Sequence, residues 1–231
     1  MATHVSRVER YTKVSTINVP NALTVFRLLL VPVFIYLKFV DTWSAQWWAL
    51  LVFCVAAATD QLDGKIARAY GLVTDFGRVV DPIADKALTL SAFIILSIQG
   101  VLPWWFTILV AIRELGITVM RAFFLRRGIV VSASQSGKIK TVLQVLAIFL
   151  LLIPWDYFYV LNPANRGWAS VALMSALCVA GAALAATLWS GIAYVREGLI
   201  LAREVRDSEP QNEAQLQLRL ERKVERLRRN F

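Results

Sequence analysis

Histidine and cysteine are almost absent from the sequence. Its 231 residues contain one histidine, His4, and two cysteines, Cys54 and Cys178, which both lie in apolar runs. Two isolated cysteines exclude a disulfide scaffold and a cysteine-rich metal site. A lone histidine near the N-terminus argues against a zinc site and against a catalytic triad, because both commonly depend on histidine. Acid–base or metal chemistry in this chain therefore has to use carboxylates.

Charged residues are also scarce. They make up 18% of the chain, whereas 58% of the residues are hydrophobic. In ordinary soluble domains about 25% of the residues are charged and about 45–50% are apolar. This composition excludes a disordered chain, a collagen and a simple soluble enzyme, and it predicts a polytopic membrane protein. The net charge of +9 is compatible with nucleic-acid binding. We favour the membrane interpretation, in which Lys and Arg gather on the cytoplasmic side beside anionic lipid.

Six apolar segments are long enough to cross a bilayer, which takes about 20 residues. A charge-free run over residues 87–112 is divided by Gln99-Gly100 and Pro103, because glycine and proline break helices. The first segment follows a long polar stretch and lacks a small-residue cleavage site, so we interpret it as a retained span. The sequence therefore predicts an all-α integral membrane fold with six transmembrane helices, at residues 22–40, 43–68, 79–98, 102–125, 139–157 and 168–195.

Lys and Arg are concentrated in every second connection and in both terminal segments. The positive-inside rule therefore places both termini in the cytoplasm, and tryptophans cluster at the opposite ends of the spans, as in an interfacial belt. We divide the chain into a cytoplasmic or juxtamembrane segment (1–20), a six-helix transmembrane domain (21–196) and a polar amphipathic cytoplasmic helix (197–231). The apolar face of that last helix consists of Leu216, Leu220, Val224 and Leu227. We expect the helix to lie on a lipid surface, to pair with a second copy of the chain or to be a solvated helix, and the sequence favours these alternatives equally.

Four aspartates lie at the adjoining ends of the second and third predicted spans. Asp60 and Asp63 fall on one helix face, and Asp81 and Asp85, four residues apart, share a face of the next helix. Each carboxylate costs about 2.5–3.5 kcal/mol at the centre of a membrane helix, so the set needs a cation. Hard oxygen ligands without histidine favour Mg²⁺ or Mn²⁺, and two such ions would balance four charges, as in sites that transfer phosphate. The alternative is that these aspartates cap helices or pair with nearby Lys and Arg.

The pattern Asp60-x2-Asp63-Gly64-x2-Ala67-Arg68-x8-Gly77-x3-Asp81-x3-Asp85 resembles the signature of the CDP-alcohol phosphotransferase family at every fixed position. The resemblance implies a six-helix membrane fold, usually dimeric. It also implies that a hydroxyl displaces CMP from a CDP-linked lipid or alcohol.

The same resemblance implies a role for each position. Asp60 and Asp81 would bridge two divalent cations, Asp63 would bind the first, and Asp85 would bind the second and take the proton of the attacking hydroxyl. The positions that resemble nucleotide contacts are Gly64, Arg68 and Thr74.

Two further stretches resemble one branch of that family, the bacterial phosphatidylglycerophosphate synthases. They are Asn18-Val-Pro-Asn21-Ala-Leu-Thr24-x2-Arg27, and Arg113-Glu114-x6-Arg121 with the Ser136–Thr141 segment. The resemblance implies transfer from CDP-diacylglycerol to sn-glycerol 3-phosphate on the cytoplasmic side of the cell (inner) membrane. Asn21 and Thr24 would contact CDP-diacylglycerol. Intramembrane cations are candidate functional groups, and those that suit the acceptor's phosphate are Arg113, Arg121, Lys138 and Lys140.

Three other functions are compatible with the acidic pattern. A cardiolipin synthase, or a relative with another acceptor, would share the carboxylates, although cardiolipin synthases usually have Arg-Asp in place of Arg113-Glu114. An intramembrane prenyltransferase also uses aspartates and Mg²⁺, but on helices far apart in sequence. A cation carrier would place carboxylates near mid-membrane.

Overall fold

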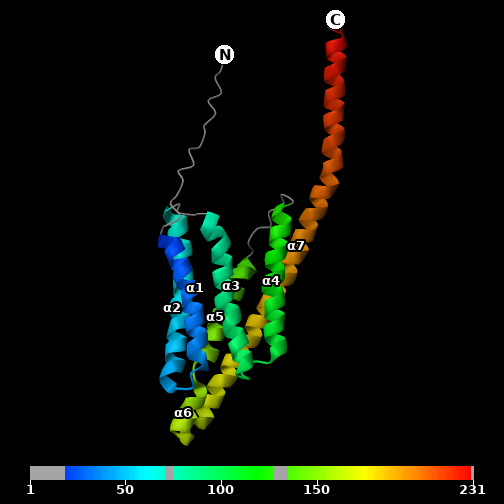
Figure 1. Cartoon of the computed structure of the whole chain (residues 1–231). Helices are drawn as coiled ribbons and strands as arrows, with labels where there is room; N and C mark the ends of the chain where they lie inside the picture. The colour runs from blue at the N-terminus through cyan, green and yellow to red at the C-terminus, as the bar shows by residue number, and fades with distance from the viewer. Residues whose placement is uncertain (1–18, 71–74, 127–134, 230–231) are drawn as a thin grey trace. The chain divides into compact units, whose positions relative to one another are not determined.

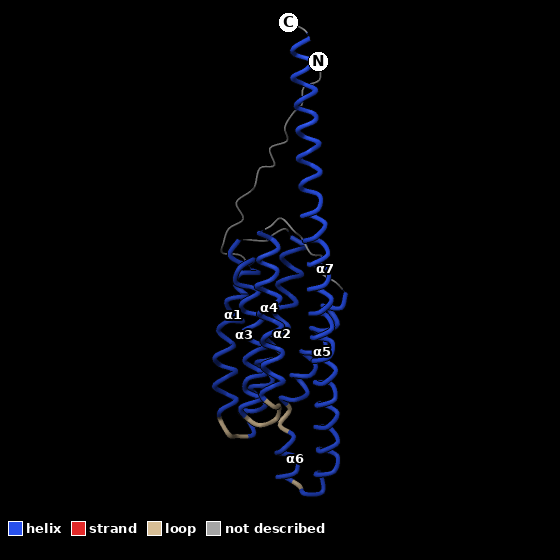
Figure 2. The backbone as a smooth tube through the Cα atoms, turned by 90° about the vertical axis from the view of Figure 1, so that its right-hand side faces the viewer, coloured by secondary structure: helices blue, strands red, loops and turns tan. Residues whose placement is uncertain are grey.

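The structure is a computed structural model that describes residues 19–70, 75–126 and 135–229. For residues 61–70, 75–79 and 204–229, and for scattered positions that include Asp81 and Lys138, it describes the backbone without the side chains. The described chain is helical and contains no strand (Figure 2). An all-α fold is therefore confirmed for the part of the chain that is described.

Seven α-helices and one short 3-10 helix follow one another along the described chain. They are α1 (Val19–Phe39), α2 (Trp43–Tyr70), α3 (Asp75–Ile98), α4 (Trp104–Arg126), α5 (Gln135–Leu152), α6 (Trp155–Leu161), η1 (Pro163–Asn165) and α7 (Arg166–Arg229). The six predicted spans fall on α1 to α5 and on α7, with two differences. The helix breaks at Ile153–Pro154, inside the fifth predicted span, because proline cannot donate a backbone hydrogen bond. The sixth predicted span continues without a break into the predicted C-terminal helix.

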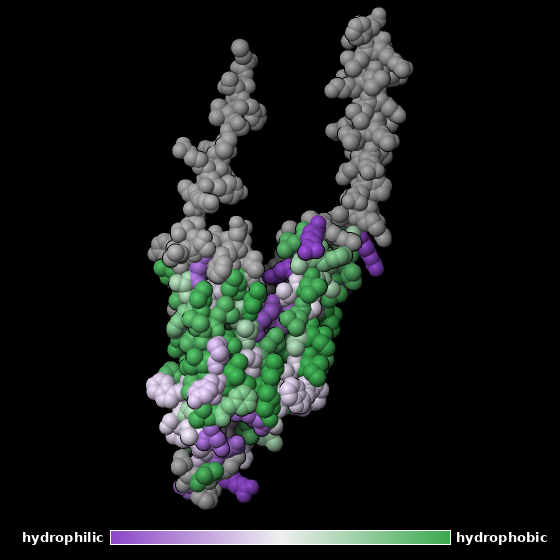
Figure 3. All heavy atoms as spheres, in the orientation of Figure 1, coloured by the Kyte–Doolittle hydropathy of each residue, from purple (hydrophilic) through white to green (hydrophobic). Residues whose placement is uncertain are grey.

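Three stretches of the described chain are long and apolar enough to cross a membrane: Asn21–Phe39 in α1, Ile139–Phe158 from α5 into α6, and Arg166–Arg203 in α7. Hydrophobic side chains cover much of the molecular face drawn in Figure 3. Several of them are widely exposed, including Val119, Val171 and Ile192, each at more than 60%. Large exposed apolar side chains at this density are typical of lipid-facing helices. The chain is therefore a membrane protein, and a total of six crossings stays a prediction.

The chain divides into two compact units, residues 1–103 with 148–176 and residues 104–147 with 177–231. In the first unit, α1, α2 and α3 lie side by side (Figure 1) and contact one another. Alanines with no exposed surface, such as Ala49, Ala56 and Ala92, line their contacts. Small residues let membrane helices approach closely, and the Phe34 and Phe53 rings, 5.9 Å apart, fill the space between α1 and α2.

Side chains bond to backbone groups at the end of α1. Gln46 donates to the carbonyl oxygen of Val40 at 2.9 Å, and Gln99 donates to that of Lys38 at 3.1 Å. The Lys38 ammonium, itself buried, donates to Gln46 Oε1 at 2.7 Å. These bonds satisfy carbonyl groups that a helix end leaves without partners, so α1, α2 and α3 are held together at this end.

Aromatic rings join α2, α6 and α7 within the same unit. Phe158 has ring contacts with Trp43, Trp47, Trp155 and Trp168, at centroid distances of 5.5, 6.4, 6.1 and 5.1 Å. These four tryptophans belong to the belt predicted from the sequence, and edge-to-face rings of this kind add to packing energy. The short helix α6 is therefore anchored through its aromatic residues.

The second unit contains α4, the first part of α5 and most of α7. At Gly198 of α7 an added Cβ would overlap the ring of Phe124 on α4. The Phe124 ring packs directly on the backbone of α7, so a larger residue at position 198 would require that ring to move. This contact joins the last turns of α4 to the middle of α7.

We expect Phe34→Ala to lower the free energy of unfolding by about 3 kcal/mol, because it leaves a cavity against Phe53. Tyr36→Ala is the matched control, since Tyr36 lies on the same helix with 69% of its surface exposed. Thermal unfolding in detergent, followed by tryptophan fluorescence, measures the difference. Equal unfolding temperatures for the two variants would contradict the packing described for α1 and α2.

Candidate active site

A polar face of α1 is buried against the neighbouring helices. Asn21, Thr24 and Arg27 recur every three residues and are 5%, 1% and 0% exposed. The Arg27 guanidinium lies 2.6 Å from Oδ1 of Asp60 on α2, whose side chain is 39% exposed. This ion pair fixes the first carboxylate of the acidic pattern to α1. Asn21 and Thr24, predicted as CDP-diacylglycerol contacts, lie on the same helix face.

The four aspartates of the acidic pattern lie on consecutive helices that contact one another. Asp60 and Asp63 are near the end of α2, and Asp81 and Asp85 are in the first half of α3. The end of one helix and the start of the next adjoin the same short connection, residues 71–74. This topology places the acidic segments of α2 and α3 at one end of the helix pair.

The structure describes the side chains of Asp60 and Asp85, while those of Asp63 and Asp81 lie outside the described residues. Among the described side chains, no three acidic, histidine or cysteine groups come together. The donor set of the pattern nevertheless fits a hard divalent cation, because all four groups are carboxylates, two on each helix. Of the predicted nucleotide contacts, Gly64 and Arg68 have only their backbone described, in α2, and Thr74 lies outside the described residues.

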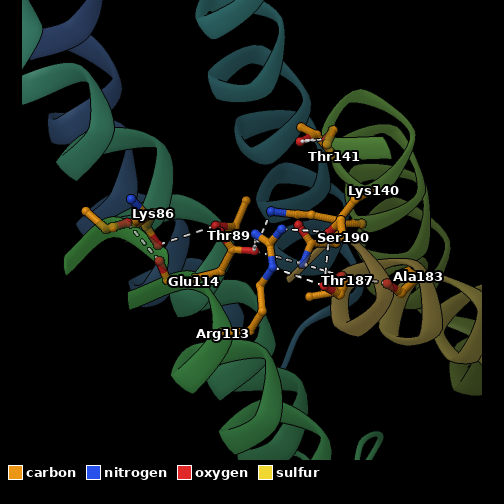
Figure 4. Close-up of polar contacts among 12 residues, drawn as sticks. Lys86, Thr89, Arg113, Glu114, Lys140, Thr141, Ala183, Thr187 and Ser190 are labelled. Carbon is orange, nitrogen blue, oxygen red and sulfur yellow. Dashed lines mark hydrogen bonds and ion pairs between the residues drawn. The ribbon is translucent and has the colours of Figure 1, made fainter. Parts of the chain in front are cut away.

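A polar network joins α4, α5 and α7 in the second unit (Figure 4). The Arg113 guanidinium makes three hydrogen bonds: from Nε to the carbonyl oxygen of Thr187 at 3.0 Å, from Nη2 to Ser190 Oγ at 2.6 Å, and from Nη1 to Glu114 Oε1 at 3.1 Å. The Arg113 side chain is 13% exposed. Its orientation is therefore set by groups on two helices.

Glu114 is the carboxylate that connects the cations of this network. Lys140, 7% exposed, forms an ion pair with Glu114 Oε1, and Gln144 approaches the same oxygen at 3.5 Å and donates to Thr187 Oγ1 at 3.1 Å. In the described ion pairs, one carboxylate thus balances the partly buried Arg113 and the buried Lys140. Without it, both would be desolvated with a like charge nearby, which is costly.

The four predicted acceptor cations do not all belong to this network. Arg113 and Lys140 are brought together around Glu114, whereas Arg121 lies over the ring of Tyr194, 5.7 Å from its centroid, in a cation–π contact. The Lys138 side chain lies outside the described residues.

Several partner residues were not predicted as site residues. They include Arg27, Gln144, Thr187 and Ser190. A signal for three of them exists in the sequence, because Gln144 interrupts the apolar run of α5, and Thr187 and Ser190 stand three residues apart in the apolar part of α7. Polar residues with helical spacing inside an apolar span indicate contacts between helices.

Fold and side chains together define a helical membrane protein with an acidic segment suited to metal and a network that joins Arg113 and Lys140 to Glu114. A family model, CDP-alcohol phosphatidyltransferase, matches residues 17–189. The chain belongs to this family, and the resemblance found in the sequence is confirmed.

Individual relatives are similar over most of the chain. A Mycobacterium tuberculosis (strain H37Rv) protein named "Probable phosphatidylglycerophosphate synthase" is 42% identical over 185 residues, which cover 79% of this chain and 82% of the relative. An Escherichia coli (strain K12) protein named "CDP-diacylglycerol--glycerol-3-phosphate 3-phosphatidyltransferase" is 35% identical over 184 residues, 77% of this chain and 93% of the relative. A Bacillus subtilis (strain 168) protein of the same name is 36% identical over 148 residues, 59% of this chain and 77% of the relative.

We expect Glu114→Ala to destabilise the protein by about 3 kcal/mol, because breaking a buried ion pair leaves charge uncompensated. Glu114→Gln should lose less, since its amide oxygen still accepts from Arg113 and Lys140. Thermal unfolding in detergent compares both with Leu115→Ala, at a neighbouring position that is 51% exposed. An unfolding temperature for Glu114→Ala equal to that of Leu115→Ala would show that Glu114 does not stabilise the cations.

Proposed function

We propose that the chain is a transferase of phospholipid biosynthesis. It moves the phosphatidyl group of CDP-diacylglycerol to sn-glycerol 3-phosphate and yields phosphatidylglycerophosphate and CMP. The observation that carries this proposal is the combination of the complete acidic pattern on α2 and α3 with the partly buried Arg113 and the buried Lys140 around Glu114. The names of the relatives that match most of the chain support the same donor and acceptor.

The acidic pattern is proposed to hold two divalent cations, Mg²⁺ or Mn²⁺. Asp60 and Asp81 would bridge them, Asp63 would bind the first and Asp85 the second. Such ions supply charge neutralisation for the phosphate groups of a phosphoryl-transfer reaction. The Arg27–Asp60 ion pair supports the assignment, because it orients the Asp60 carboxylate through a cation that is itself completely buried.

The remaining residues of this region would bind the donor and handle the proton. Asp85 is exposed and would take the proton of the acceptor hydroxyl as that oxygen attacks phosphorus and CMP leaves. A carboxylate is a weak base for an alcohol, so most of the catalysis comes from placement and charge. Arg68 would bind a phosphate of the CDP group with its planar fork. The other donor contacts proposed are Asn21, Thr24, Gly64 and Thr74.

The acceptor's phosphate would be bound by the cations of α4 and α5. Lys140 is buried and Arg113 is partly buried. In the ion pairs that the structure describes, the two cations share one carboxylate, Glu114, and a phosphate dianion is proposed to add the charge that matches them. Arg121 and Lys138 are proposed as further contacts. A neutral alcohol would leave these desolvated cations without additional compensation, which favours an acceptor with a phosphate of its own.

Three stretches are long and apolar enough to cross a membrane, and we propose that the chain crosses it six times. We propose that α1 to α5 and α7 all cross the cell (inner) membrane, that both termini and the acidic site face the cytoplasm, and that the protein is a homodimer. The distribution of Lys and Arg between the connections supports the orientation. The proposed division is residues 1–20, the catalytic domain over 21–196 and the helix over 197–231.

A CMP-release assay with a panel of acceptors tests the reaction. Purified full-length protein is given cytidine-labelled CDP-diacylglycerol with sn-glycerol 3-phosphate, phosphatidylglycerol, inositol or serine in turn. Of the four acceptors, we expect only sn-glycerol 3-phosphate to release CMP, because it carries the phosphate proposed to bind Arg113 and Lys140. Release that depends on phosphatidylglycerol would indicate a cardiolipin synthase instead, and release with inositol or serine would contradict phosphate recognition.

Asp60→Asn and Asp81→Asn should each abolish CMP release, as should removal of divalent cations with EDTA. Each substitution takes charge from a residue proposed to bridge both ions, while asparagine at position 60 keeps an oxygen for Arg27 and should preserve the fold. Asp41→Asn is the matched control, because Asp41 is exposed in the α1–α2 connection and bonds to Tyr157. Activity near that of the wild type in either variant would overturn the two-metal assignment.

A further inference from the structure

Three groups of α7 contact the side chain of Arg113: the Thr187 carbonyl, the Ser190 hydroxyl and the backbone at Gly191. Thr187 and Ser190 are 0% and 2% exposed in the apolar part of this helix. The Thr187 carbonyl accepts from Arg113 Nε, and Ser190 Oγ accepts from Arg113 Nη2. Ser190 Oγ also donates to the Thr187 carbonyl at 3.0 Å. Because its own proton is used there, the Ser190 hydroxyl presents a lone pair to Arg113.

Gly191 gives the Arg113 side chain the room that this arrangement needs. A Cβ at this position would lie 3.2 Å from Arg113 Cγ and 3.4 Å from Nε. Gly181, ten residues earlier in the same helix, has nothing within 4 Å of an added Cβ. Glycine inside a helix is less favourable than alanine, and at position 191 the close approach of Arg113 gives a reason for it.

The three bonds of Arg113 involve all three nitrogens of its guanidinium. A planar guanidinium held in this way cannot rotate about its stem without losing bonds. Glu114 extends the constraint to Lys140 on α5 through their ion pair. The positions of Arg113 and Lys140 relative to one another are thus fixed by these bonds before a ligand binds.

We propose that Ser190 and Gly191 of α7 are positioning residues that hold the Arg113 guanidinium, joined through Glu114 to Lys140, in the orientation that receives the acceptor's phosphate. They act through Arg113 and do not touch the substrate. Orienting the cations in advance removes an ordering cost from acceptor binding. This inference rests on the proposed function, in which Arg113 binds that phosphate.

Steady-state kinetics of full-length variants separate positioning from a general structural role. Ser190→Ala should raise the KM for sn-glycerol 3-phosphate about tenfold, since it removes a hydrogen bond to a charged group. Its KM for CDP-diacylglycerol and its kcat should stay within about twofold of the wild type, because Arg113 serves only the acceptor. Ser190→Thr keeps the hydroxyl and should restore most of the acceptor affinity.

Gly191→Ala is the second variant, and it tests the same arrangement without removing a polar group. Its added methyl should displace Arg113 by a few tenths of an ångström and raise the acceptor KM about fivefold. The matched controls lie on the same helix. Gly181→Ala adds a methyl in open space, and Ser175→Ala removes a hydroxyl that bonds only to the Ala172 carbonyl among the bonds described; both should leave the acceptor KM unchanged.

A double-mutant cycle shows whether Ser190 acts through Arg113. In an Arg113→Ala background, Ser190→Ala should cause no further rise in the acceptor KM, because the group that it positions is gone. Additive effects of the two substitutions would overturn the proposal. So would an unchanged acceptor KM in both Ser190→Ala and Gly191→Ala, or an equal rise in the KM of both substrates.

The wild-type protein distinguishes failure of this inference from failure of the proposed function. If it releases CMP only with an uncharged alcohol, phosphate recognition fails, and the positioning proposal fails with it. If it uses sn-glycerol 3-phosphate and the Ser190 and Gly191 variants behave like their controls, the positioning proposal alone is overturned.

Discussion

Charge buried within apolar helices is the constraint on which the rest of this structure depends. An ionised side chain inside a membrane helix is tolerated where a partner of opposite charge or a polar group compensates it. Arg27 on α1 therefore meets Asp60 on α2, and Lys140 on α5 meets Glu114 on α4. Because each pair joins two helices, these charged groups also hold neighbouring helices together.

The need to compensate buried charge also distinguishes two polar regions, one of carboxylates and one that contains paired cations. The acidic pattern of α2 and α3 suits divalent cations, and the network around Glu114 joins two cations to one carboxylate among the described ion pairs. The proposed reaction, which transfers a phosphate-linked group to a phosphorylated alcohol, would use both. The carboxylate pattern is typical of the family, whereas the network on α4, α5 and α7 is proposed to bear on the choice of acceptor.

Small residues have two distinct uses in this fold. Alanines at the contacts of α1, α2 and α3 let these helices approach closely. In α7, Gly191 and Gly198 make room for particular side chains, the Arg113 stem and the Phe124 ring. The glycines of α7 are therefore not equivalent, since Gly181 of the same helix has open space around it.

Much of this protein is determined by the sequence alone. The six apolar segments predict α1 to α5 and α7, but not the break that separates α6 from α5; a hydrophobic run of sufficient length has few alternatives in a bilayer. The spacing of the aspartates places Asp60 with Asp63 and Asp81 with Asp85, because residues three or four apart share a helix face. The family follows from that pattern and is confirmed by comparison with known proteins.

The contacts between helices were decided by the tertiary structure. These contacts join residues that are far apart in the sequence. Arg27 and Asp60 are 33 positions apart, and Glu114 and Lys140 are 26 apart. Ser190 and Gly191 are about 77 positions from Arg113. Helical periodicity determines which residues share a face, but it does not determine which face of another helix lies opposite. That choice depends on the packing of side chains along the whole length of each helix.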